Sequence, residues 1–192
     1  MSFFKIANDA SAVAVRRNFL GQSSLILSGA AIALLAGKDA LAAKGGQSTE
    51  QDIRILNTAI SAELEAIAAY QVGAESGLLQ QPVLALALTF QGHHKEHADI
   101  LSKTIVKLGG KPTVAKAKYN FPTEKLKSQA DVLQFAATLE KGAVSAYLNA
   151  VPLFGNPDLA KAAASILGDE AMHWAILRNA LGEVPVPSAF MS

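Results

Sequence analysis

The sequence predicts an all-α protein, a four-helix bundle with a long crossover between its second and third helices. Hydrophobic residues make up 51% of the 192-residue chain, with alanine and leucine dominant. Runs of alternating Val, Ile and Thr are missing, so helices are expected rather than strands. Four long stretches repeat apolar residues every three or four positions, the period of a helix with one buried face. The length suits one compact domain.

The charge composition bears on the partners of the protein. The chain has 17 basic and 16 acidic residues, for a net charge of +1. The basic residues are scattered rather than gathered into a stripe, which argues against a nucleic-acid partner. There is no cysteine, so any metal would have to be held by oxygen and nitrogen ligands.

The first 43 residues have the order of an export signal. Arg16 and Arg17 are followed by Phe19 and Leu20, which resembles a twin-arginine motif. An apolar stretch and a group of small residues come next. We therefore expect recognition by the twin-arginine export machinery and a periplasmic or otherwise exported protein.

The end of this signal is expected at Ala42 or Ala43, where small residues suit cleavage by signal peptidase. The apolar stretch over residues 25–36 is short for a membrane-spanning helix. An uncleaved anchoring helix is the alternative. Residues 1–43 carry four basic and two acidic residues, so the remainder has 13 basic and 14 acidic residues and a net charge of −1.

The first expected helix covers residues 49–76. Ser48 and Gln51 have the spacing of a capping box, and Gly77 is a stop signal. Its predicted buried stripe consists of Ile53, Leu56, Ile60, Ile67 and Tyr70.

The second expected helix covers residues 82–108. Pro82 suits a first turn, and Gly109 follows the last apolar position. Residues 109–128 have no sustained period, and their length suits a crossover along the bundle. The predicted stripe of this helix consists of Val83, Ala87, Phe90, Leu101 and Leu108.

The third and fourth helices are expected over residues 128–153 and 157–181, separated by a short turn at Gly155 and Asn156. Residues 182–192 form a proline-containing tail. Two helix hairpins joined by one long crossover distinguish this topology from simple up-and-down bundles. The predicted stripes are Leu133, Ala137, Val144 and Tyr147 on the third helix, and Leu159, Ala163, Ile166 and Leu177 on the fourth.

Polar residues interrupt all four stripes at positions that should be buried. Ionised carboxylates in a bundle core cost several kcal/mol each unless protons, cations or metal ions compensate them. A metal centre would resolve that cost for the whole set. The candidate ligands are Glu63, His94, His97, Glu140, Glu170 and His173.

Other polar neighbours are less suited to the site. Glu65 and Asp169 lie off the buried faces, and Glu96 lies about 100° around the helix from His97. His93 is one turn before His97 and could chelate with it, although we expect it at the bundle edge. Tyr70, Tyr147 and Trp174 are expected to pack, with hydrogen bonding to ligands or electron relay as the alternative for the two tyrosines.

The two halves of the chain repeat each other. Glu63 and Tyr70 recur as Glu140 and Tyr147, at an offset of 77 residues, and His97 recurs as His173, at an offset of 76. At the offset of 76 residues, His94 corresponds to Glu170. The second half therefore carries Glu-x-x-His, whereas the first carries His-x-x-His.

These motifs resemble the ferritin-like superfamily, in which two single glutamates and two Glu-x-x-His pairs bind two metal ions. The resemblance covers residues 49–181. Three stretches are similar to exported ferritin-like proteins related to plant desiccation-related proteins: residues 55–70, 90–101 and 169–190. Carried over, Glu63 and Glu140 would be single ligands and Glu170 with His173 an intact pair, whereas His94 departs from the pattern.

The resemblance implies a di-metal site for iron, with manganese or zinc as alternatives, and an oxidoreductase acting with oxygen or peroxide. Since His94 replaces a carboxylate, a single metal ion is also conceivable. The alternative is a metal-free bundle with a degenerate site, serving a stress-protective or envelope interaction role. A homodimer through the outer helix faces is compatible with either function.

Overall fold

The structure, a computed structural model, describes residues 46–191, with side chains from Thr49 onward. The predicted export signal over residues 1–43, with its cleavage after Ala42 or Ala43, lies outside this range. Among the described residues, none of the helices combines the length and apolar character needed to cross a membrane.

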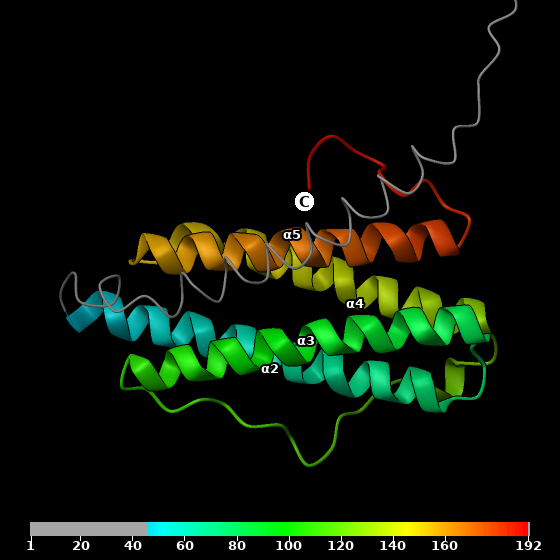
Figure 1. Cartoon of the computed structure of the whole chain (residues 1–192), viewed down its shortest axis with the longest axis horizontal. Coiled ribbons are helices and arrows are strands. Elements are labelled where there is room, and N and C mark those ends of the chain that lie inside the picture. The colour runs from blue at the N-terminus through cyan, green and yellow to red at the C-terminus, as the bar shows by residue number, and fades with distance from the viewer. Residues whose placement is uncertain (1–45, 192) are drawn as a thin grey trace, which may run out of the picture.

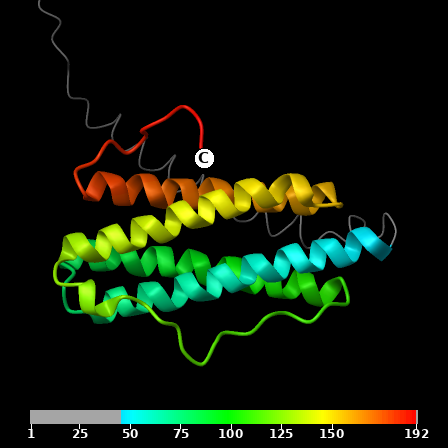
Figure 2. The same ribbon diagram turned by 180° about the vertical axis from the view of Figure 1, so that it is seen from behind.

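The described chain forms four long helices in two antiparallel hairpins, α2 with α3 and α4 with α5, lying side by side (Figures 1 and 2). The predicted all-α four-helix bundle with its long crossover is confirmed. The helices are α2 (Gly46–Glu75), α3 (Gln81–Lys107), α4 (Gln129–Ala150) and α5 (Pro157–Ala180).

The start of α2 differs from the prediction. The helix already includes Gly46, so Ser48 lies within it and the expected capping box is wrong. Gln51 instead donates a side-chain hydrogen bond to the carbonyl of Leu153, 2.6 Å away, which connects α2 to the short turn that follows α4. The helix ends as expected before Gly77, whose φ of 70° suits glycine.

Helix α4 also ends earlier than predicted. Regular helix stops at Ala150, and a single 3-10 turn, η2 (Val151–Leu153), replaces the last predicted residues. Pro152 explains the change because it has no amide hydrogen to continue the helix. Ser128 caps the start of α4 by accepting a hydrogen bond from the amide of Asp131, at 3.2 Å.

The crossover runs along the outside of the first hairpin, between the ends of α3 and α4, and includes the short turn η1 (Thr123–Lys125) (Figure 1). Two contacts fix its beginning. A Cβ on Gly110 would lie 2.8 Å from Cγ2 of Ile53, so only glycine fits there. Asn57 of α2 accepts hydrogen bonds from the amide and hydroxyl of Thr113, at 2.7 and 2.8 Å.

Two apolar clusters fill the bundle on either side of its polar centre. All residues of the predicted stripes are buried or partly buried. One cluster includes Leu56, Ile105 and Ile166, and the other includes Phe90 and Leu177. The polar centre therefore lies between two apolar layers.

Candidate metal centre

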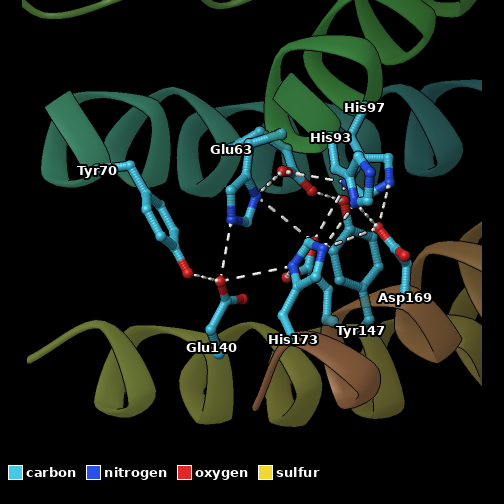
Figure 3. Close-up of polar contacts among 10 residues, drawn as sticks. Glu63, Tyr70, His93, His97, Glu140, Tyr147, Asp169 and His173 are labelled. Carbon is cyan, nitrogen blue, oxygen red and sulfur yellow. Dashed lines mark hydrogen bonds and ion pairs between the residues drawn. The ribbon is translucent and has the colours of Figure 1, made fainter. Parts of the chain in front are cut away.

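The six predicted ligands meet in the middle of the bundle, brought there by all four helices (Figure 3). The exposed fraction of each side chain is 2% or less, except for His97 at 15%. The sequence-predicted set is thus assembled in space, whereas metal binding by these residues stays a prediction. The set is Glu63, His94, His97, Glu140, Glu170 and His173.

The ligand atoms form two overlapping groups of four, and within each group all atoms lie within 4.8 Å of one another. The two groups share His94 and Glu170. The first group is completed by Glu63 and His97, and the second by Glu140 and His173. The repeat relates the two groups to each other, because it pairs Glu63 with Glu140, His97 with His173, and the two shared residues with one another.

Glu170 lies between the two single-group histidines. Its Oε1 is 3.2 Å from Nδ1 of His97, and its Oε2 is 3.6 Å from Nδ1 of His173. Each oxygen therefore faces a different ligand group. Glu170 would therefore serve as a ligand in both groups if metal were bound.

Several buried polar atoms at this centre have no hydrogen-bond partner among the described residues. Orphaned buried groups are costly, and natural proteins rarely keep them without a ligand or a function. Every one is a ligand-type atom, so the residues present fit a metal ion. The atoms are His97 Nδ1, His173 Nδ1, Glu140 Oε2 and both carboxylate oxygens of Glu170.

His94 is the other residue that belongs to both groups. Its Nδ1 lies 2.8 Å from Oε2 of Glu63, and its Nε2 lies 3.2 Å from Oε1 of Glu140. Burial alone would lower the pKa of His94, but hydrogen bonds to both glutamates raise it to about 10. Without metal, His94 is therefore an imidazolium that donates to one carboxylate from each helix hairpin.

The other two candidate histidines also hold protons. Burial alone would lower the pKa of both, but the neighbouring carboxylates raise the pKa of His97 to about 9 and of His173 to about 11. Burial alone would raise the pKa of Glu63, but the adjacent imidazoles of His94 and His97 lower it to about 2. Burial raises the pKa of Glu170. Metal binding to this centre must displace protons from imidazole nitrogens.

Tyr70 and Tyr147 were expected to pack, and both are buried, but each also hydrogen-bonds to a candidate ligand. Tyr147 on α4 donates to Oε1 of Glu63 on α2 at 2.5 Å, and Tyr70 on α2 donates to Oε1 of Glu140 on α4. Burial and the adjacent carboxylates raise the pKa of both tyrosines well above its usual value. Both therefore stay protonated and orient the two glutamates.

Asp169 is the residue that the sequence reasoning missed. Its Oδ2 lies 3.2 Å from Nε2 of His173 and 3.5 Å from Nε2 of His97, so it contacts the outward nitrogens of both single-group histidines. Its position four residues before His173 was the available signal, since such residues share a helix face. His93 lies at the bundle edge, as expected, with its side chain 37% exposed. Glu96 is exposed and Glu65 is outside both groups.

Together, two helix hairpins, one crossover and a central carboxylate and histidine set define the class of four-helix bundles with an internal candidate di-metal site. The profile of the Ferritin-like domain family matches residues 51–183, more than half of the chain. The protein therefore belongs to the ferritin-like domain family. No curated protein matches this sequence.

Solved structures show the same fold at low sequence identity. A conserved hypothetical protein from Mycobacterium tuberculosis is 23% identical, with a TM-score of 0.65 over 74% of this chain and 99% of that one. A ferritin-like diiron-carboxylate protein from Bacillus anthracis is 20% identical, with a TM-score of 0.62 over 71% and 99%. The bacterioferritin of Desulfovibrio desulfuricans is 21% identical, with a TM-score of 0.66 over 72% and 84%.

Proposed function

We propose that this protein is an exported metalloprotein whose central site holds two metal ions, iron first and manganese or zinc as alternatives. With iron or manganese bound, it acts as an oxidoreductase with oxygen or peroxide. The observation that carries the proposal is the set of orphaned buried ligand atoms, with one oxygen of Glu170 directed to each ligand group. The diiron-carboxylate protein and the bacterioferritin of the same fold support the choice of metal.

When bound, a pair of redox metals would supply the electrons needed to reduce oxygen or peroxide. The residues of this chain have distinct tasks around it. Tyr70 and Tyr147 each hold one oxygen of a single glutamate. Tyr147 holds Oε1 of Glu63, whose Oε2 faces His94 and His97, whereas Tyr70 holds Oε1 of Glu140, the same oxygen that faces His94 and His173. Asp169 contacts the outward nitrogens of His97 and His173 and thereby orients their inward nitrogens toward the centre. The apolar layers keep bulk water away.

The export part of the proposal rests on the twin-arginine pattern around Arg16 and Arg17. Twin-arginine export accepts folded proteins, which would allow metal insertion before export. The similarity to desiccation-related proteins makes protection from oxidative or drying stress a suitable physiological setting. A homodimer stays a prediction, testable by light scattering of the purified protein.

The first test is metal analysis of protein exported by its own signal and purified without chelators. We expect about two redox metal ions per chain, as the two ligand groups require. A variant with Glu63→Gln and Glu140→Gln keeps the shape of the site but removes two anionic ligands, so it should lose most of the metal. Equal metal content in both proteins would contradict the site, and metal-free wild-type protein would contradict the function.

His94 favours one second candidate, a metal-free bundle with a structural role. As an imidazolium hydrogen-bonded to Glu63 and Glu140, it compensates buried carboxylates without any metal. On this alternative, chelator treatment would leave the melting temperature unchanged, and metal addition would not raise it. A metal-dependent melting temperature would exclude it.

A further inference from the structure

A second cluster of ligand-type atoms lies just outside the central set. It consists of His93 Nδ1, His173 Nε2 and Asp169 Oδ2, which we call the outer trio. The two nitrogens are 2.8 Å apart, and each lies 3.2 Å from the carboxylate oxygen. The proposed function does not use this grouping. From the sequence, His93 was considered only as a chelating partner of His97 and was expected at the bundle edge.

These separations match neighbouring ligands on one cation. Ligand atoms at right angles around a metal, each bonded at roughly 2.1 Å, lie about 3 Å apart. Two imidazole nitrogens and one carboxylate on one face of a metal leave further positions open. The ring of Phe90 stacks on His173 with centroids 4.0 Å apart, which holds that imidazole in place.

The outer trio lies closer to solvent than the central ligands. The side chains of His93 and Asp169 are 37% and 24% exposed, whereas Glu140 and Glu170 are 1% and 0% exposed. Figure 3 shows His93, His97 and Asp169 grouped at one side of the centre, away from Tyr70. A cation coming from this side would meet the trio first.

His173 belongs to both clusters through opposite ring nitrogens. Its Nδ1 is directed to the central oxygens of Glu140 and Glu170, at 3.5 and 3.6 Å, while its Nε2 is directed to the outer trio. A neutral imidazole has one nitrogen with a free lone pair and one bearing a proton. His173 can therefore serve one cluster at a time, which couples the two.

We propose that the outer trio is a third cation site, selective for divalent transition metals such as Fe²⁺, Mn²⁺, Co²⁺ or Zn²⁺, through which the central site is loaded. Only the loading of the central site rests on the proposed function, whereas cation binding at the outer trio does not. While a cation is at the trio, Nε2 of His173 is the ligand nitrogen. Once the central site is full, Nε2 carries the proton and donates to Asp169, whose acceptor oxygen is already in place.

Variants at position 93 can distinguish loss of the ligand from loss of the side chain, because His93 contributes Nδ1 to the outer trio. An aspartate places Oδ1 at the same number of bonds from the backbone, so His93→Asp keeps a ligand where His93→Ala removes it. Glu96→Ala is the matched control, since Glu96 is exposed on the same turn of α3. Melting temperatures would verify that all four proteins are folded.

The measurement is stopped-flow absorbance as CoCl2 is mixed with chelator-stripped full-length protein, followed by the cobalt content at equilibrium. We expect His93→Ala to slow loading about tenfold or more, in line with losses caused by changes around metal ligands. Its final content of tightly held cobalt should equal that of wild type. His93→Asp and Glu96→Ala should load at nearly the wild-type rate.

Anomalous diffraction from crystals soaked in CoCl2 separates this inference from the proposed function. With Glu63→Gln and Glu140→Gln, a cobalt peak bounded by the trio should persist, and adding His93→Ala should abolish it. If wild-type crystals showed a cobalt peak at the trio but no central metal, the outer site would be supported and the di-metal function would be overturned. Central metal with unchanged loading in His93→Ala and no peak at the trio would overturn the outer site alone.

Discussion

Individual residues decide how this centre differs from a symmetric di-metal site. The repeat that relates the two hairpins pairs His94 with Glu170 and His93 with Asp169, each at an offset of 76 residues. Two adjacent positions on α3 therefore carry imidazoles where α5 carries carboxylates. The exchange removes two negative charges, and it adds a donor that spans Glu63 and Glu140.

His94→Glu should strengthen metal binding and weaken the metal-free fold. A fourth buried carboxylate adds an anionic ligand, but it also replaces the imidazolium that compensates Glu63 and Glu140. Removing one partner of a buried ion pair costs roughly 3–5 kcal/mol of stability. Urea unfolding in chelator and metal competition titrations would measure both effects, with Lys118→Glu as the charge-matched surface control. Unchanged stability without metal would contradict the role of His94.

Tyr147→Phe tests the orientation of Glu63. Loss of the phenol leaves a buried carboxylate oxygen without its donor, so the free energy of unfolding should fall by about 1–3 kcal/mol. Metal affinity should also drop, because Glu63 is no longer held. The matched control is Tyr119→Phe on the crossover, whose hydroxyl only accepts a 3.3 Å bond from the amide of Lys116. Equal losses in both variants would refute the assignment.

Metal affinity should rise with pH. The pKa of His94, His97 and His173 is raised to about 10, 9 and 11, so each carries a proton at neutral pH that a metal must displace. Below these pKa values, each displaced proton increases the metal affinity by as much as about tenfold for every unit that the pH rises. Competition with a colorimetric chelator between about pH 6 and 8 would measure the slope. A flat profile would show that the histidines do not bind.

The same shifts predict the opposite trend for the stability of the metal-free protein. A raised histidine pKa stabilises the fold fully below the unfolded value of 6.5, and this contribution disappears as pH rises through about 9 to 10. Glu63, with its pKa lowered to about 2, loses its contribution only as the pH falls toward that value. Chelator-treated protein should therefore unfold more easily in alkaline solution.

At the scale of elements, a buried aspartate fixes the second hairpin to the first. Asp52 of α2 is 2% exposed, and its two oxygens accept hydrogen bonds from the amides of Gly155 and Asn156, at 2.8 and 3.1 Å. These amides lie in the turn that precedes α5. The contact fixes the start of α5, and therefore the position of Glu170 and His173 along the bundle axis, level with the other candidate ligands.

Asp52→Ala should destabilise the bundle by about 1–3 kcal/mol, because two amides lose their acceptor. It should also loosen the metal site, although Asp52 touches no candidate ligand. Thermal unfolding and cobalt affinity would be measured beside Glu50→Ala, an exposed acidic residue on the same helix. A stability loss without any change in affinity would show that the turn does not position α5.

For the whole molecule, metal binding and folding should be linked. The ligands come from four helices and two hairpins, so the unfolded chain cannot assemble the site, and any bound metal stabilises the fold. An excess of metal of about 100 times the dissociation constant should add about 2.7 kcal/mol. Calorimetry of stripped and reloaded protein would measure this gain. The Glu63→Gln and Glu140→Gln variant should show little of it.

The sequence by itself determined the helices, the crossover and the inward carboxylates. Helical period and stop signals are local properties, so Glu63 and Glu140 could be assigned to buried faces from their neighbours alone. The early start of α2 and the η2 turn were missed, because tertiary contacts and one proline override propensity at helix ends.

Only the tertiary structure decided which atoms meet across the helices. Three sets of contacts join residues from different helices: the tyrosine hydroxyls exchanged between α2 and α4, the two carboxylates that face His94, and the outer trio. The contact of Asp169 with His173 in that trio is the exception, since both lie on α5. Helical periodicity places a side chain on a face. The packing of one face against another then fixes its partner, since angstrom-scale offsets between helices decide whether two polar atoms touch.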